Sequence, residues 1–468
     1  MRQLSQHDAS FLDADTIHAN ANVTFVQIYD QSTVPGGTLR LKEILTHIQG
    51  RLHRSPIFRS KLLRVPLELD APYWVEDEQF DLEYHVRHIA LPKPGDWRQF
   101  CIQASRIHAR ALDLHRPLWE IYVIEGLDSI TDLPPGSFAL LTKMHHSAID
   151  VATRNEFIEV LHDVTRKPPQ PETPEPWFPE RAPGAIPLRA RAGMHLLCDP
   201  TRLINPLRRA APTAMTFMRD LLRAEVHPTA TRFNTIVSPH RVFDTRRFGR
   251  DEFERIRKLV PGATIHDAVI AVCAGGLRRY LAGHAELPSA ALSAIVPLDL
   301  GARSPPEAVS VQIMIGTNIE DPVERLSALH MQTSAPLATD MAVAQPPACC
   351  TITDVPGPPA PVYLYGARMT YFSAMLPISD GMGLVFAVSS YDDLIVVSPT
   401  SCRELMSDPL VFTQCVRDSF QEFLALADAA PEVKRAAKTT TNKAAKKPRP
   451  VGPRVSASHR PRPSSRKA

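Results

Sequence analysis

The amino-acid sequence predicts an α/β fold made of two layered domains. The chain has 468 residues, of which 44% are apolar, so it can bury a large core but exceeds the size at which one core usually stops growing. Strand-like and helix-like segments are mixed in both halves, and a proline-rich stretch separates the halves. We therefore expect a first domain at 1–165, a connector at 166–230, a second domain at 231–430 and a tail at 431–468.

In the first half, three segments have the β-branched and aromatic content of strands: NVTFVQIYD at 22–30, LWEIYVIEGL at 118–127 and SFALLTKM at 137–144. Two further segments, 97–114 and 151–164, carry apolar residues at the spacing of an amphipathic helix. Together they predict a sheet covered by helices.

The connector begins with closely spaced prolines between Lys167 and Pro187, which remove backbone donors and exclude a persistent helix or central strand. The next stretch mixes Leu, Met and Phe with seven arginines and predicts one or two amphipathic helices, broken by Pro200, Pro206 and Pro212. Such helices either pack on the protein body or rest on a membrane surface.

The second half opens with a helix predicted at 264–284. Its apolar residues recur at helical spacing, and Thr264 is placed to cap its start. Four strands are then expected at 293–300, 311–319, 383–391 and 393–400.

The formal net charge of +3 hides two parts of opposite sign. Residues 433–468 hold twelve Lys or Arg and no acidic residue, so the remainder has 41 basic and 50 acidic residues, a net charge of −9. An acidic body argues against nucleic acid as the main ligand. The tail has almost nothing to bury and is expected to be disordered, either as a solubilising end or as a contact with anionic lipid headgroups.

The seven cysteines show no paired metal spacing and do not suggest a disulfide framework. The first residues lack the pattern of a secretory signal, and no apolar run is long enough to cross a bilayer. We expect a cytoplasmic protein that is soluble or peripheral on a membrane.

The stretch TKMHHSAIDVAT, residues 142–153, carries the strongest chemical signal. His145 and His146 follow a predicted strand, and Asp150 follows where the next helix would begin. Side chains in such turns project from a rigid support, although Asp150 can equally be a helix N-cap. No helical His-Glu-x-x-His pattern, cysteine cluster or G-x-S-x-G elbow accompanies them, so a histidine acting directly as general base remains. Adjacent side chains diverge, so one histidine is expected to react and the other to support it.

The same stretch resembles the HHxxxDG signature of the wax ester synthase/diacylglycerol acyltransferase family. Further blocks resemble that family in order: LSQHDASFLDAD near the start, the PLW element at Pro117, Leu118 and Trp119, the helix with Asp267, and SDGMGLVFAVSSYDDLIVV near residue 390. The resemblance covers roughly residues 3 to 425.

The resemblance implies two chloramphenicol-acetyltransferase-like domains with a tunnel at their interface. It implies acyl-CoA as a substrate rather than a cofactor, and diacylglycerol or a long-chain alcohol as acceptor. His146 would be the base, Asp150 would orient the loop or the ring, and His145 would shape the site. It also implies contact with the inner face of the membrane or with lipid droplets. Trp119 and Asp267 have structural alternatives, as a core residue and as a partner of the helix dipole.

Three residues depart from the family pattern. Val151 replaces a glycine, His266 replaces the asparagine before Asp267, and Asp354 replaces another asparagine. They motivate an alternative function: a catalytically weak relative that binds acyl chains or coenzyme A as a lipid-droplet or membrane interaction protein. A condensation enzyme acting on carrier-bound thioesters is a third hypothesis.

Overall fold

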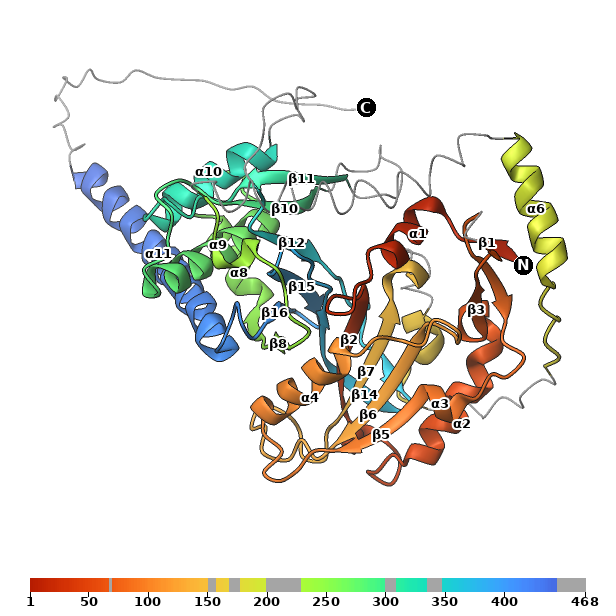
Figure 1. The fold of residues 1–468 in the computed structure, drawn as a ribbon. Helices are drawn as coiled ribbons and strands as arrows, with labels where there is room; N and C mark the ends of the chain where they lie inside the picture. The colour runs from red at the N-terminus through yellow and green to blue at the C-terminus, as the bar shows by residue number, and fades with distance from the viewer. Residues whose placement is uncertain are drawn as a thin grey trace, which may run out of the picture.

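The structure is a computed structural model that describes residues 1–66, 70–149, 157–167, 177–198, 229–298, 309–334 and 347–443. Two sheets form two lobes that lie side by side, here called the N-lobe and the C-lobe (Figure 1). The N-lobe sheet has the order β13-β14-β2-β7-β6-β5. Its strands are β2 (Asn22–Asp30), β5 (Val86–Ala90), β6 (Trp119–Glu125), β7 (Phe138–His145), β13 (Tyr363–Leu364) and β14 (Ala367–Met375).

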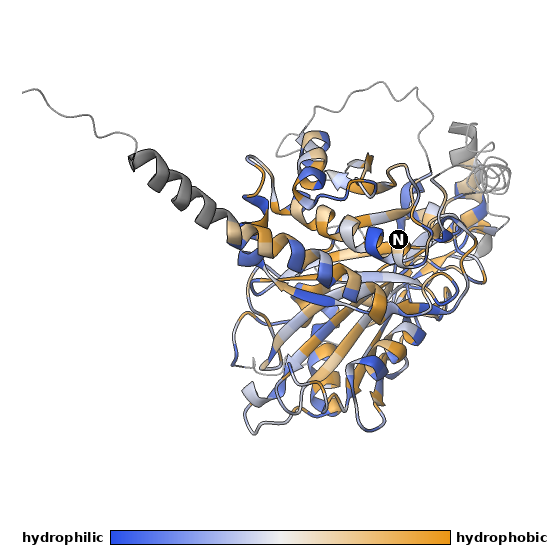
Figure 2. Ribbon diagram, turned by 90° about the vertical axis from the view of Figure 1, so that its left-hand side faces the viewer, coloured by the Kyte–Doolittle hydropathy of each residue, from blue (hydrophilic) through white to orange (hydrophobic). Residues whose placement is uncertain are grey.

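The C-lobe sheet has the order β11-β10-β12-β15-β16-β8, and β9 pairs with β16. Its strands are β8 (Arg241–Phe243), β9 (Arg246–Gly249), β10 (Ser293–Leu298), β11 (Val309–Met314), β12 (Cys350–Asp354), β15 (Val385–Tyr391) and β16 (Leu394–Cys402). Many residues within the strands are hydrophobic, whereas the helices carry both hydrophobic and hydrophilic residues (Figure 2). The predicted α/β class is confirmed.

The boundary between the two lobes is not a single cut in the sequence. β13 and β14 belong to the range predicted as the second domain, yet β14 pairs with β2 and completes the N-lobe sheet. Val355 and Val362 lie in the same hydrophobic core as Phe25. A division at residues 166–230 therefore describes the two halves of the chain but not the two sheets, because β14 is buried only when it pairs with a strand of the other half.

A small sheet, helices and short 3-10 turns complete the N-lobe, and η1 (Gln31–Thr33), η2 (Leu52–Arg54) and η3 (Pro56–Phe58) are among the turns. The small sheet has the order β1-β4-β3, with β1 (Arg2–Gln3), β3 (Ser60–Leu63) and β4 (Tyr73–Glu76). The other helical segments include α1 (Gln6–Asp13), α2 (Leu41–Arg51), α3 (Leu82–His85), α4 (Trp97–Ala109) and the single turn η5 (His146–Ala148).

Helix α4 joins the lobes. Asp96 caps its start, accepting from the backbone N–H of Gln99 at 2.7 Å. Its buried Phe100 packs in one cluster with Phe243 and Val396 of the C-lobe. Its last carbonyls accept hydrogen bonds from Asn20 and Asn22 near the start of β2. The helix therefore runs from the contact between the lobes toward the end of β2 that faces the histidine pair.

The C-lobe helices are α8 (Arg250–Arg257), α9 (Ile265–Gly283), α10 (Pro322–Ser334) and α11 (Pro409–Lys443). Thr264 caps α9 as predicted, accepting from the N–H of Asp267 at 3.1 Å. Helices α9 and α11 approach closely because Gly276 has no side chain, and a Cβ there would lie 2.8 Å from the Cα of Val416.

The connector and the tail agree with the sequence only in part. Helix α6 (Ala185–Cys198) begins within the proline-rich stretch and packs Leu188 and Ala192 against Val65 and Tyr73. The tail was predicted to be disordered from residue 431, but α11 continues to Lys443. The breaks predicted at Pro200, Pro206 and Pro212 lie outside the described residues. In the part of the chain described, no helix is long and apolar enough to span a membrane.

Candidate active site

The histidine pair lies at the end of β7. His145 is the last residue of the strand, pairs with Asn22 of β2, and donates its backbone N–H to Leu118 O at 3.1 Å. The next backbone N–H, from His146, donates to Ala21 O at 2.7 Å. Both backbones are therefore fixed by the two neighbouring strands, as expected for side chains on a rigid support.

His145 is buried and has a partner at each ring nitrogen. Its Nδ1 accepts from the backbone N–H of Ser147 at 3.2 Å and lies 2.7 Å from Ser147 Oγ. Because a backbone N–H can only donate, Nδ1 is the acceptor and Nε2 carries the proton. That Nε2–H donates to Asp15 Oδ2 at 3.0 Å, and Asp15 Oδ1 accepts from Ala21 N at 2.7 Å. His145 is thus a fixed structural link.

His146 has different surroundings. Phe11 of α1 stacks on its ring, with centroids 3.9 Å apart and planes 25° apart. Its Nδ1 is buried and has no hydrogen-bond partner, while the residue as a whole is partly exposed. Burial lowers the pKa of His146, and the neighbouring imidazoles of His145 and His7 lower it further. Its own backbone carbonyl and Asp8 act in the opposite direction but are outweighed. The imidazole is therefore neutral at pH 7, as a general base requires.

Two of the predicted positions cannot be placed. Asp150 and Val151 lie outside the described residues, so the predicted role of Asp150 stays a prediction.

The PLW element packs in the core beside the strand end that carries the histidine pair. Trp119 is 1% exposed, donates its indole N–H to Phe58 O at 3.0 Å and stacks on His85 with centroids 4.5 Å apart. Leu118 supplies the carbonyl that holds His145, and Pro117 is buried. These contacts favour the structural alternative for Trp119.

Asp267 is also held by the protein. It is 1% exposed, and its carboxylate accepts from Thr264 N at 2.9 Å and Thr333 Oγ1 at 2.6 Å, and bonds His330 Nδ1 at 3.0 Å. Burial raises the pKa of Asp267, but these hydrogen bonds outweigh it and hold the pKa below its ordinary value. Asp267 therefore fixes the start of α9 against α10.

The two departures His266 and Asp354 are partners. His266 Nδ1 lies 3.1 Å from Asp354 Oδ2, which links the start of α9 to the end of β12. Burial lowers the pKa of His266, but the hydrogen bond and charge of Asp354 outweigh burial and raise it. Two asparagines of the family pattern are here replaced by a histidine and an aspartate that contact each other.

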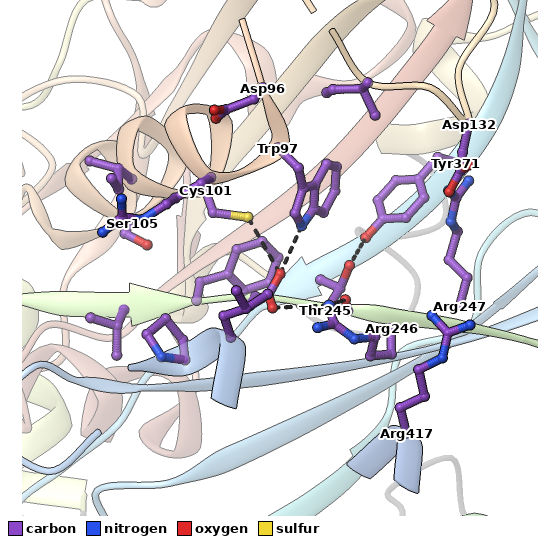
Figure 3. Close-up of a pocket in the computed structure, with 18 of the residues that line it drawn as sticks. Asp96, Trp97, Cys101, Ser105, Asp132, Thr245, Arg246, Arg247, Tyr371 and Arg417 are labelled. Atoms are coloured by element: carbon purple, nitrogen blue, oxygen red, sulfur yellow. Dashed lines mark hydrogen bonds and ion pairs between the residues drawn. The ribbon is translucent and has the colours of Figure 1, made fainter. Parts of the chain in front are cut away.

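A cavity of about 1160 Å³ lies between the lobes, lined along α4 from Asp96 to Arg106 (Figure 3). Trp97 Nε1 and Thr413 Oγ1 donate to the buried Asp244 there, at 2.7 and 2.5 Å, and Thr245 bonds Tyr371. His146 does not line this cavity. The predicted tunnel to His146 therefore stays a prediction.

Sequence reasoning missed Phe11 and Asp15, although both lie in the quoted stretch LSQHDASFLDAD. Asp15 is 130 positions before His145, so no local spacing connects them. Among the residues that the structure describes, no group of three His, Cys, Asp or Glu side chains could hold a metal ion.

Comparison with known families gives two matches along the chain. Residues 4–269 match the wax ester synthase/diacylglycerol acyltransferase catalytic domain, and residues 330–423 match the WS/DGAT C-terminal domain.

Individual relatives agree. The chain is 31% identical to the O-acyltransferase WSD of Acinetobacter baylyi over 74% of this chain and 82% of that protein. It is 28% identical to a Mycobacterium tuberculosis protein, named provisionally as a diacylglycerol O-acyltransferase, over 92% of each chain. The solved wax ester synthase/diacylglycerol acyltransferase of Marinobacter aquaeolei VT8 has the same fold, with a TM-score of 0.67 at 22% identity over 91% of this chain and 100% of that one.

Proposed function

Because the chain belongs to the wax ester synthase/diacylglycerol acyltransferase family of acyl-CoA-dependent O-acyltransferases, we propose that His146 is its catalytic base. The acyl donor is a long-chain acyl-CoA, and the acceptor is the free hydroxyl of diacylglycerol, with long-chain alcohols as further acceptors. The observation that carries the proposal is the partly buried, neutral imidazole of His146, the residue directly after β7.

The proposed reaction is one direct transfer. His146 Nε2 takes the proton of the acceptor hydroxyl while the oxygen attacks the thioester carbonyl. The tetrahedral intermediate then expels the thiolate, which takes the proton back from the imidazolium and leaves as coenzyme A. No covalent enzyme intermediate forms, and no metal is needed because the thioester is already an activated acyl group.

The geometry supports the use of Nε2. Nδ1 of His146 is fully buried, so Nε2 is the ring nitrogen left for a substrate. His145 and Asp15 hold the strand end in place without competing for the proton, because the His145 ring is already paired at both nitrogens. Asp150 is proposed to orient the loop or the ring.

The test uses purified full-length protein with labelled palmitoyl-CoA and diacylglycerol, hexadecanol, or no acceptor. We expect product from both acceptors, and a loss of about 10²- to 10⁴-fold in kcat for His146→Ala. His115→Ala is the matched control, because His115 is a histidine whose side chain is 96% exposed. Equal rates for His146→Ala and wild type would sink the assignment, and acyl-CoA binding without turnover in wild type would favour the weakly active binding protein.

A peripheral contact with an anionic membrane or lipid-droplet surface on the cytoplasmic side is a separate proposal. Helix α6, on the outer side of the N-lobe, exposes Ile186 (81%) and Met194 (64%) beside Arg189 and Arg191, and Phe178 before it is 85% exposed (Figure 1). Apolar side chains beside arginines suit an interface of acyl chains and anionic headgroups. We expect flotation with anionic liposomes at low salt, reduced by Ile186→Ser with Met194→Ser. Protein left in the soluble fraction at both low and high salt would contradict it.

A further inference from the structure

The rings of His7, Phe11 and His146 contact one another in a row that begins at the protein surface. The exposed His7 meets Phe11 edge-on, with centroids 5.2 Å apart and planes at 83°. Phe11 then lies nearly parallel to the imidazole of His146, at 3.9 Å. One face of the His146 ring is therefore covered by a hydrocarbon ring rather than by water.

Helix α1 presents Phe11 from a fixed position. Ser5 caps the helix by accepting from the N–H of Asp8 at 3.0 Å, and Ala9 and Leu12 are buried in the N-lobe core. Beyond the helix, Asp15 bonds both Ala21 and His145. The helix that carries Phe11 is thus anchored on both sides of it, which holds the Phe11 backbone beside His146.

From this geometry we propose that Phe11 is a positioning residue for the acyl transfer. Its ring keeps the imidazole of His146 in one orientation, with Nδ1 directed into the protein and Nε2 left for the acceptor hydroxyl. The inference rests on the proposed role of His146. It adds a residue that acts through the base, by deciding where the His146 ring points.

Two consequences follow from a ring at this distance. Rotation of the imidazole about its Cβ–Cγ bond would drive it into Phe11, so the orientation is restricted without any hydrogen bond to Nδ1. The stack also excludes water from the ring, which disfavours the charged imidazolium. The charged or titratable groups that face His146 are His7 and Asp8 from α1 and His145 from β7. Substitution of Phe11 leaves all three in place.

The experiment compares Phe11→Ala, Phe11→Leu and Phe11→Tyr in the full chain. The first measurement is kcat and KM for palmitoyl-CoA across pH. The second is the NMR titration of the His146 ring in protein labelled at histidine, without substrate, with the signal assigned by its loss in His146→Ala. Thermal unfolding confirms that each variant is folded.

We expect Phe11→Ala to lower kcat about tenfold while KM stays within about twofold, because orientation is lost but binding is not. The titration midpoint of His146 should move up toward its ordinary value of about 6.5. Phe11→Tyr should retain both wild-type properties, whereas Phe11→Leu, which fills the space without a flat ring, should resemble Phe11→Ala. Phe80→Ala is the matched control, because Phe80 is also partly buried and stacks on a different histidine, His85, at 5.3 Å; it should leave the His146 titration unchanged.

An unchanged titration midpoint and kcat in Phe11→Ala would overturn the proposal, and so would wild-type behaviour of Phe11→Leu. If wild type has no transferase activity, the proposed function fails, but the titration without substrate still decides whether Phe11 controls the imidazole.

Discussion

Two adjacent histidines end β7, and their surroundings separate their chemistry. His145 is held at both ring nitrogens, so its proton stays on Nε2 beside Asp15. His146 has a buried Nδ1 without a partner and a ring covered by Phe11. The sequence predicted that one histidine reacts and the other supports it, because adjacent side chains diverge. It did not predict Asp15 or Phe11, because their contacts with the pair depend on how the first 22 residues fold back onto β7.

The Asp15 contact gives a prediction at this scale. In Asp15→Ala the buried Nε2–H of His145 and the N–H of Ala21 lose their acceptor, which is expected to cost about 1–3 kcal/mol of unfolding free energy. Urea unfolding measures the loss. Asp128→Ala is the control, because Asp128 is exposed and should change stability by less than about 0.5 kcal/mol. Equal stabilities for the two variants would show that Asp15 does not hold the strand end.

The two departures from the family pattern on helix α9 and strand β12 are in contact with each other in the structure. His266 lies in the first turn of the helix, Asp354 ends the strand, and the two side chains contact each other within the C-lobe. From sequence these positions are 88 residues apart and counted as two separate reasons to doubt activity. In the structure they form a pair just before Val355, where the chain crosses into the N-lobe core.

A double-mutant cycle tests whether the pair is a unit. Asp354 is 52% exposed, so screening limits the coupling between His266→Asn and Asp354→Asn to about 0.2–1 kcal/mol. Because Asp354 raises the pKa of His266, the ion pair stabilises the fold fully below the unfolded pKa of about 6.5, and this contribution is lost as pH rises through the folded value. Unfolding of the four proteins at pH 6 and pH 8.5 should give coupling only at the lower pH. Coupling that is absent at both would make the two substitutions independent.

Helices could be predicted from the sequence where capping residues and apolar periodicity mark them locally. The pairing of strands that are distant in the sequence could not be predicted. Thr264 with Asp267 marks the start of α9, because a capping residue acts within three positions. No local sequence signal identifies β2 as the strand that pairs with β14. The register of this pair is set by the N-lobe core, which forms from both halves of the chain. For the same reason the residues of the N-lobe sheet could not be delimited from sequence.

At the scale of the whole molecule, the lobes are joined by apolar packing and by polar contacts. Phe100 and Tyr122 of the N-lobe pack with Phe243 and Val396 of the C-lobe. Around this cluster, Trp97 donates to Asp244, Arg247 pairs with Asp132 at 2.7 Å, and His18 lies 3.1 Å from Asp380. An interface of this kind holds the two lobes in one arrangement, so the tunnel proposed between them would have walls fixed by the fold rather than by the substrate.

Buried histidines make this assembly sensitive to acid. Burial lowers the pKa of His108 to about 3, helped by the charges of Arg241 and Lys143, and lowers the pKa values of His47 and His162 to about 4. In the unfolded chain each titrates near 6.5, so the unfolded state binds more protons as pH falls below that value. Their contribution to stability is therefore present above pH 6.5 and is lost as pH falls toward 4.

Urea unfolding between pH 7 and pH 4.5 should show a free energy that falls by up to about 4 kcal/mol per pH unit from these three groups. His108→Gln, which keeps a side chain able to bond Thr24, should flatten the curve by about one proton, because one of the three titrations is removed from the unfolded state. His115→Gln is the matched control and should leave the slope unchanged, because the His115 side chain is 96% exposed. If His108→Gln has the wild-type slope, His108 is protonated within the folded protein, and the acid sensitivity does not come from the helix that joins the lobes.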